Sequence, residues 1–179
     1  MNNISRTRLF TMYLIYLGIT FLILFFQLIP LNLFPEAWVG PDILLGVTLA
    51  WVTRQPEFVP ILLVTVSFLL ADFLLQRPPG LFALLVVIGT EYIKSHVNGL
   101  RYASFIEEWI TAGFAITFII VAFWCVQAVV GIGQAPFTMS LLHIVATIIT
   151  YPAILFGSHI FFGIRKSPSH SDDSMGRRS

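Results

Sequence analysis

The chain has 179 residues, of which 57% are hydrophobic and 11% are charged, and its formal net charge is +1. Soluble domains carry about 45–50% apolar and about 25% charged residues, so a soluble protein of this composition would lack a solvated surface. The basic residues are dispersed along the chain, and we expect no nucleic-acid partner. The composition instead predicts an all-α integral membrane protein in contact with the lipid bilayer.

Six apolar segments predict six transmembrane helices in one compact bundle, because a span needs about 20 apolar residues to cross a hydrocarbon core of ~30 Å. The single transmembrane domain covers residues 1–164, with spans at about 9–29, 41–53, 58–75, 80–94, 109–130 and 137–162. The second span is short, at about 20 Å of helix. It is either extended at its ends or lies within the bundle without crossing the full lipid thickness. Residues 165–179 are polar and predict a disordered tail.

Proline and acidic residues mark the starts of three expected spans. Pro41, Pro56 and Pro79 each stand where a first helical turn begins, a place where a missing N–H is no loss. Asp42 and Glu57 follow directly, at the positive end of the helix dipole. We therefore expect tight turns before spans two, three and four, with these helices as consecutive antiparallel neighbours.

The distribution of basic residues predicts the orientation of the bundle. With six spans, Arg77 is the one residue among the ten Lys and Arg that lies on the side away from the termini. Cytoplasmic loops carry an excess of Lys and Arg. Both termini are therefore expected in the cytoplasm. The other nine basic residues are Arg6, Arg8, Arg54, Lys94, Arg101, Arg165, Lys166, Arg177 and Arg178.

Ionisable residues within the expected spans are costly and therefore informative. Asp42 opens the second span, and Asp72 interrupts the apolar third span. Arg77, five residues beyond Asp72, is a candidate partner for either carboxylate. This outer group either locks the turn between spans three and four or serves a binding or gating role. Glu91 and Lys94 are spaced i, i+3 and are expected to pair.

The remaining polar residues predict no catalytic centre. His143 is expected to be a hydrogen-bonded packing residue, and Cys125, inside an apolar run, a buried thiol. No nucleophile has a base beside it, and no spacing of His, Cys, Asp and Glu is typical of a metal site. An enzyme is therefore not supported, and no cofactor or metal is expected.

The motifs follow one another in an order that resembles a known family. Gly40-Pro41-Asp42 opens an apolar helix, and Arg54-Gln55-Pro56-Glu57 follows it. A second apolar run ends in Asp72, and Arg77-Pro78-Pro79-Gly80 then opens the fourth span. Over about residues 38–95 this order resembles the bacterial rod shape-determining protein MreD family.

The resemblance implies a non-enzymatic scaffold in the bacterial inner (cytoplasmic) membrane that helps to organise sidewall peptidoglycan synthesis and rod shape. It implies MreC as a direct partner, with MreB, RodA and a class B penicillin-binding protein in the same assembly. The family is similar in fold to the S-components of vitamin transporters. The chain departs from the family at Phe68, where a glycine is usual. The candidate structural or partner-binding residues are Pro41, Asp42, Pro56, Glu57, Asp72, Arg77 and Gly80.

Two other functions fit the composition less well. An S-component-like transporter subunit would commonly carry an Ala-x-x-x-Ala docking surface on its first span, where Gly18 is here the only Gly or Ala. A lipid-processing membrane enzyme would have only Asp42, Asp72 and His143 as outer-side candidates for its chemistry.

Overall fold

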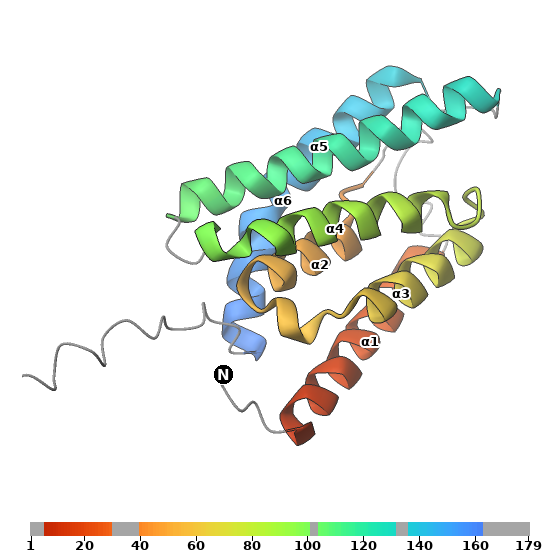
Figure 1. Cartoon of the computed structure of the whole chain (residues 1–179). Helices are drawn as coiled ribbons and strands as arrows, with labels where there is room; N and C mark the ends of the chain where they lie inside the picture. Colours follow the sequence, from red (N-terminus) through yellow and green to blue (C-terminus); the bar gives the residue numbers. More distant parts are fainter. Residues whose placement is uncertain (1–5, 30–39, 101–103, 132–135, 163–179) are drawn as a thin grey trace, which may run out of the picture.

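The computed structural model describes residues 6–29, 40–100, 104–131 and 136–162, and within these ranges the chain is all-helical (Figure 1). The expected tail at 165–179 lies outside the described residues. The helices are α1 (Arg6–Leu28), α2 (Ile43–Arg54), the 3-10 turn η1 (Pro56–Phe58), α3 (Ile61–Leu74), α4 (Leu81–Leu100), α5 (Phe105–Val130) and α6 (Phe137–Phe162).

The short helix α2 lies at the centre of the bundle. All ten residues from Leu44 to Thr53 are buried, and the helix packs most extensively on α6 and α4. A helix that is apolar all round needs such a surrounding. Its 12 residues make about 18 Å of helix. Of the two arrangements expected for this segment, the structure therefore shows the short helix enclosed by the bundle.

The expected order of neighbours is correct for α3 and α4 but wrong for α2 and α3. The helices α3 and α4 pack side by side, whereas α3 otherwise contacts α1 and touches α2 little. The turn between α3 and α4 uses two left-handed backbone positions, at Gln76 (φ 54°) and Gly80 (φ 83°). Between α2 and α3, the turn η1 and Pro60 carry the chain away from α2.

The prolines lie slightly outside the positions predicted for them. Asp42 is the N-cap of α2, so Pro41 precedes the cap instead of occupying the first helical turn. Pro56 opens η1, and Pro60 is the N-cap residue of α3. Pro79 lies in the α3–α4 turn, two residues before α4 begins. Pro56 thus occupies the first position of η1, whereas Pro41 and Pro79 lie in the segments before α2 and α4.

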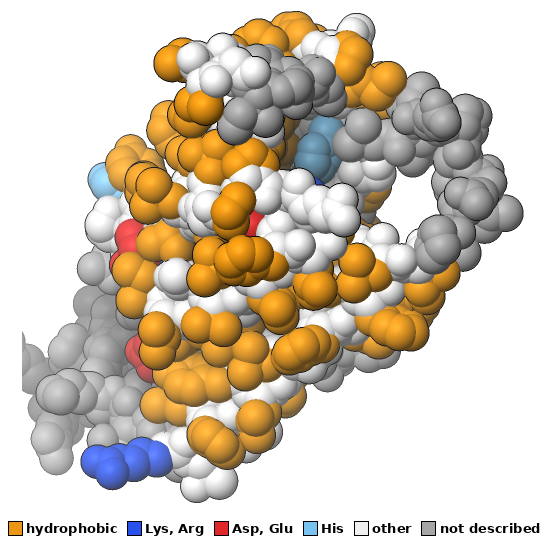
Figure 2. Space-filling model, turned by 90° about the vertical axis from the view of Figure 1, so that its right-hand side faces the viewer, with side chains coloured by type: hydrophobic (Ala, Val, Ile, Leu, Met, Phe, Trp, Pro, Cys, Tyr) orange, Lys and Arg blue, Asp and Glu red, His pale blue; other side chains and the backbone are white. Residues whose placement is uncertain are grey.

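The outer surface of the bundle is strongly apolar. Three of the described helices are long and apolar enough to cross a membrane: α1, α5, and Phe137–Ser158 of α6. Large side chains such as Phe10, Phe25 and Phe114 are exposed, and hydrophobic side chains cover most of the described surface in Figure 2. Cys125 is also exposed, on α5, and the expectation of a buried thiol is wrong. Monomeric soluble proteins rarely expose so much contiguous apolar area. The surface therefore points to a membrane protein.

Candidate functional site

Asp42 joins three parts of the bundle at one end of α2. Its Oδ1 accepts a hydrogen bond from the Leu45 N–H at 2.9 Å, and its own N–H donates to Thr147 Oγ1 of α6 at 3.0 Å. Its Oδ2 lies 3.6 Å from Nη1 of Arg77, in the α3–α4 turn. The side chain is buried. The carboxylate therefore caps α2 and fixes this end of the helix against α6 and the turn.

Asp72 ties the end of α3 to the first turn of α4. Its Oδ2 accepts hydrogen bonds from the N–H groups of Gly80 at 3.0 Å and Ala83 at 3.2 Å. These donors belong to the start of α4, where N–H groups have no partner within the helix. The residue is fully buried, and its Oδ1 has no hydrogen-bond partner among the described residues. One carboxylate oxygen of Asp72 thus caps the N-terminus of α4 from the end of the preceding helix.

Arg77 pairs with Asp42 because Asp72 is turned toward the backbone of α4. The guanidinium lies over the ring of Phe82, 4.7 Å from its centroid, a cation–π geometry. The backbone N–H of Arg77 donates to the Asp72 carbonyl at 3.0 Å. Gly80, with its positive φ, completes the same turn. The structure therefore brings together four of the seven candidate residues, with Pro41 adjacent to them.

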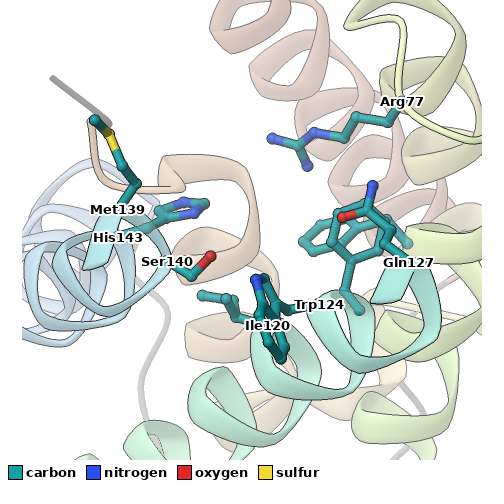
Figure 3. A pocket seen from close by; sticks show the side chains of 9 residues that line it. Arg77, Ile120, Trp124, Gln127, Met139, Ser140 and His143 are labelled. Carbon is teal, nitrogen blue, oxygen red and sulfur yellow. The ribbon is translucent and has the colours of Figure 1, made fainter. Parts of the chain in front are cut away.

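A cavity of about 170 Å³ opens beside Arg77, between α4, α5 and α6 (Figure 3). His143 of α6 lines it, and its imidazole makes no hydrogen bond with a described residue. The expectation that His143 is a hydrogen-bonded packing residue therefore stays a prediction. The other polar lining side chains are Arg77, Trp124, Gln127 and Ser140.

A second polar cluster lies at the opposite end of α2 and was not predicted. Nε of Arg54 lies 3.0 Å from Oε1 of Glu108, and the Glu108 side chain is 2% exposed. Thr53 Oγ1 also donates to Glu108 Oε1, at 3.2 Å, and lies 3.4 Å from the Tyr151 hydroxyl. This cluster joins α2, α5 and α6. It was not predicted because span five was expected to begin at Trp109, which places Glu108 outside the helix.

A capping box was the sequence signal that could have revealed Glu108. Ser104 Oγ accepts from the Glu107 N–H, and the Glu107 carboxylate accepts from the Ser104 N–H at 2.8 Å. The pattern Ser-x-x-Glu before an apolar run is typical of a helix start. It begins α5 at Phe105 and places Glu108 in the first turn, facing the bundle.

The remaining candidates lie near this second end. Lys94 Nζ is 2.7 Å from Glu91 Oε1, which confirms the predicted pair, and it also donates to the Val59 carbonyl. Pro56 opens η1, and Glu57 is exposed within it. The Glu57 backbone carbonyl accepts a hydrogen bond from a tyrosine hydroxyl of α1 at 3.3 Å. Pro56 and Glu57 therefore do not join the cluster around Asp72.

The polar residues at the two ends of α2 make hydrogen bonds and ion pairs that hold the helices together. Among the described residues, no group of three or more His, Cys, Asp and Glu is close enough to hold a metal ion. Comparison of the chain with known protein families, with curated proteins and with solved structures finds no match. Within the described residues, the structure itself therefore gives the class of protein. It is an all-helical bundle with an apolar exterior and with polar residues at both ends of a buried central helix.

Proposed function

We propose that this chain is a non-enzymatic scaffold of the bacterial inner membrane, of the MreD type, that binds MreC and helps to organise sidewall peptidoglycan synthesis. MreB, RodA and a class B penicillin-binding protein would belong to the same assembly. One observation carries the proposal. The residues on which the resemblance depends, Asp42, Asp72, Arg77 and Gly80, are used in this chain to fasten helices to one another.

A scaffold requires a rigid body with a surface that other membrane proteins can contact. The buried α2 and the polar contacts at its two ends supply the rigidity. The exposed apolar side chains of α1, α5 and α6 supply the surface, which is suited to lipid or to the helices of other membrane proteins. MreC, a single-span protein with a large outer domain, would be held through its span and the adjoining segment.

The arrangement in the membrane is part of the proposal: one bundle of six membrane-embedded helices with both termini in the cytoplasm. Arg8 lies over Phe58 at 5.9 Å, and Lys94 donates to the Val59 carbonyl, so both basic residues lie at the η1 end of the bundle. Arg54 ends α2 at the same side. Arg77 lies at the other end, which agrees with an excess of basic residues on the cytoplasmic side.

Cysteine labelling tests this orientation. In a Cys125→Ser background, single cysteines replace two exposed residues, Pro79 in the α3–α4 turn and Glu57 in η1. In spheroplasts, a membrane-impermeant thiol reagent should label Pro79→Cys at once and Glu57→Cys only after permeabilisation. The reverse pattern would contradict the proposed orientation.

Affinity purification tests the scaffold function. The tagged chain is solubilised in detergent from its native membrane, and the proteins that accompany it are identified by mass spectrometry. We expect MreC together with cell-wall synthesis enzymes. Asp72→Lys should reduce MreC recovery, whereas Glu57→Lys, at an exposed position, should not. Unchanged MreC recovery with Asp72→Lys, in a variant that remains helical and monodisperse, would contradict the role of this end of the bundle.

The cavity beside Arg77 favours a second candidate, an S-component-like small-molecule transporter subunit. Its volume of about 170 Å³ would hold a small ligand within the bundle. This function predicts recovery of an energising subunit with its ATPases, or of a tightly bound small molecule, and no cell-wall protein. The same purification therefore separates the two candidates.

A further inference from the structure

The cavity beside Arg77 gathers polar side chains from three segments. Arg77 comes from the α3–α4 turn, Trp124 and Gln127 from α5, and Ser140 and His143 from α6. Figure 3 shows the polar ends of Arg77, Gln127, Ser140 and His143 directed toward a common space. Its volume of about 170 Å³ is close to the ~150 Å³ of an engineered cavity that binds benzene. The space therefore suits a small chemical group.

Most hydrogen-bond donors around this cavity lack acceptors within the described part of the chain. The indole Nε1 of Trp124 is buried and has no partner among the described residues. The side chains of Gln127, Ser140 and His143 make no hydrogen bond with a described residue. Gln127, Ser140 and His143 are half-buried, whereas the buried Trp124 donor without an acceptor costs free energy. The cavity therefore calls for an occupant rich in acceptor atoms.

The charge around the cavity indicates an anion. Arg77 lines it, and the Asp42 carboxylate, which faces Arg77, is not among the lining residues. Nη1 of Arg77 is 3.6 Å from Asp42 Oδ2, longer than the about 2.7–2.9 Å of a charge-assisted hydrogen bond. A guanidinium carries five N–H donors, so this single long contact leaves N–H groups for a ligand.

We infer that this cavity binds a phosphate group, carried by a membrane lipid or free in solution. Phosphate offers several acceptor oxygens and negative charge, and the planar fork of arginine matches it. The apolar walls, which include Phe82 and Phe123, suit the hydrocarbon that adjoins a lipid headgroup. The lipid source depends on the membrane placement proposed above, whereas phosphate binding itself does not depend on MreC.

Binding is measured on the purified full chain in detergent micelles by isothermal titration calorimetry. Three probes separate the sources: dihexanoyl phosphatidic acid, the phosphate-free lipid dihexanoyl glycerol, and inorganic phosphate. Binding of phosphatidic acid alone identifies a lipid phosphate, and binding of both phosphatidic acid and inorganic phosphate, or of inorganic phosphate alone, identifies phosphate whatever its carrier. Binding of none of the probes, or binding of dihexanoyl glycerol as tight as that of phosphatidic acid, overturns the inference.

Two substitutions connect binding to the cavity: Gln127→Leu, which nearly conserves volume, and Trp124→Phe, which keeps an aromatic ring. Gln127→Leu and Trp124→Phe each remove donors, and each should weaken phosphate binding about 10-fold, the effect of losing one hydrogen bond to a charged group. Gln27→Leu, at an exposed position near the end of α1, is the matched control and should bind as the parent chain does. Equal affinity in all three variants would place any bound phosphate elsewhere and overturn the inference. No step involves MreC, so the scaffold proposal fails or survives separately.

Discussion

Asp72 offers a sharp test of how the bundle is fastened, because both of its side-chain hydrogen bonds end on one oxygen. Oδ2 accepts from Gly80 and Ala83, whereas Oδ1 has no partner among the described residues. Asp72→Asn retains one carbonyl oxygen, and this oxygen can take the place of Oδ2. Asp72→Ala retains none and leaves two N–H groups of α4 without an acceptor.

The expected losses of stability differ accordingly. A hydrogen bond to a charged group contributes about 1.5–3 kcal/mol, and two bonds to one oxygen are not additive, so Asp72→Ala should cost about 3 kcal/mol. Asp72→Asn loses only the charge, and its cost should be about 1 kcal/mol. Glu57→Ala, at an exposed acidic position, should stay within about 0.5 kcal/mol of the parent chain.

Thermal unfolding of the purified chain in micelles, followed by far-UV circular dichroism, measures these differences. For a chain of this size, 1 kcal/mol corresponds to roughly 2–4 °C in Tm. Asp72→Ala should therefore lower Tm on the order of 10 °C, and Asp72→Asn by about 3 °C. Equal losses for the two variants would refute the reasoning, because they would show that the negative charge, and not the acceptor oxygen, fastens α4.

Three further changes test other contacts. Glu108→Gln or Arg54→Met alone should cost about 3–5 kcal/mol in the same unfolding assay, because each leaves a buried partner, and the double variant should cost less than the sum. Gly46→Ala would place its Cβ 2.5 Å from Cδ1 of Ile154, so it should cost about 1 kcal/mol, and Ile154→Val, which lacks that atom, should restore the loss. Lys94→Met should cost about 1 kcal/mol, since it removes a hydrogen bond to the turn before α3, and an unchanged Tm would show that this bond adds nothing.

The sequence predicted helix boundaries well where a long apolar run ends at polar or proline residues. The first expected span, 9–29, lies within three residues of α1 at both ends, and the sixth, 137–162, matches α6. Both are long apolar runs bounded by polar or proline residues. The third span was expected to begin too early, at 58, because Pro60 is the N-cap residue of α3. The fifth was expected too late, at 109, because the Ser104 capping box begins α5 at Phe105.

The partners of the buried charges could not be predicted in the same way. Asp42 and Asp72 were expected at one end of the bundle, and the sequence left Arg77 a choice between them. The choice depends on the left-handed turn at Gln76 and Gly80, which points Asp72 at the α4 backbone. Arg54 and Glu108 are far apart in the chain, and only the packing of α2 on α5 brings them together.

The enclosed position of α2 has a consequence for how the protein is made. About 18 Å of helix is too short to cross a hydrocarbon core of ~30 Å by itself. During synthesis, the helix would therefore gain little free energy from inserting into lipid by itself. Its largest packing surface is α6, whose residues follow about 80 positions later in the chain. Within the proposed membrane arrangement, the centre of the bundle is completed only when α6 has been synthesised, and until then α2 can pack only on the helices made before α6, chiefly α4.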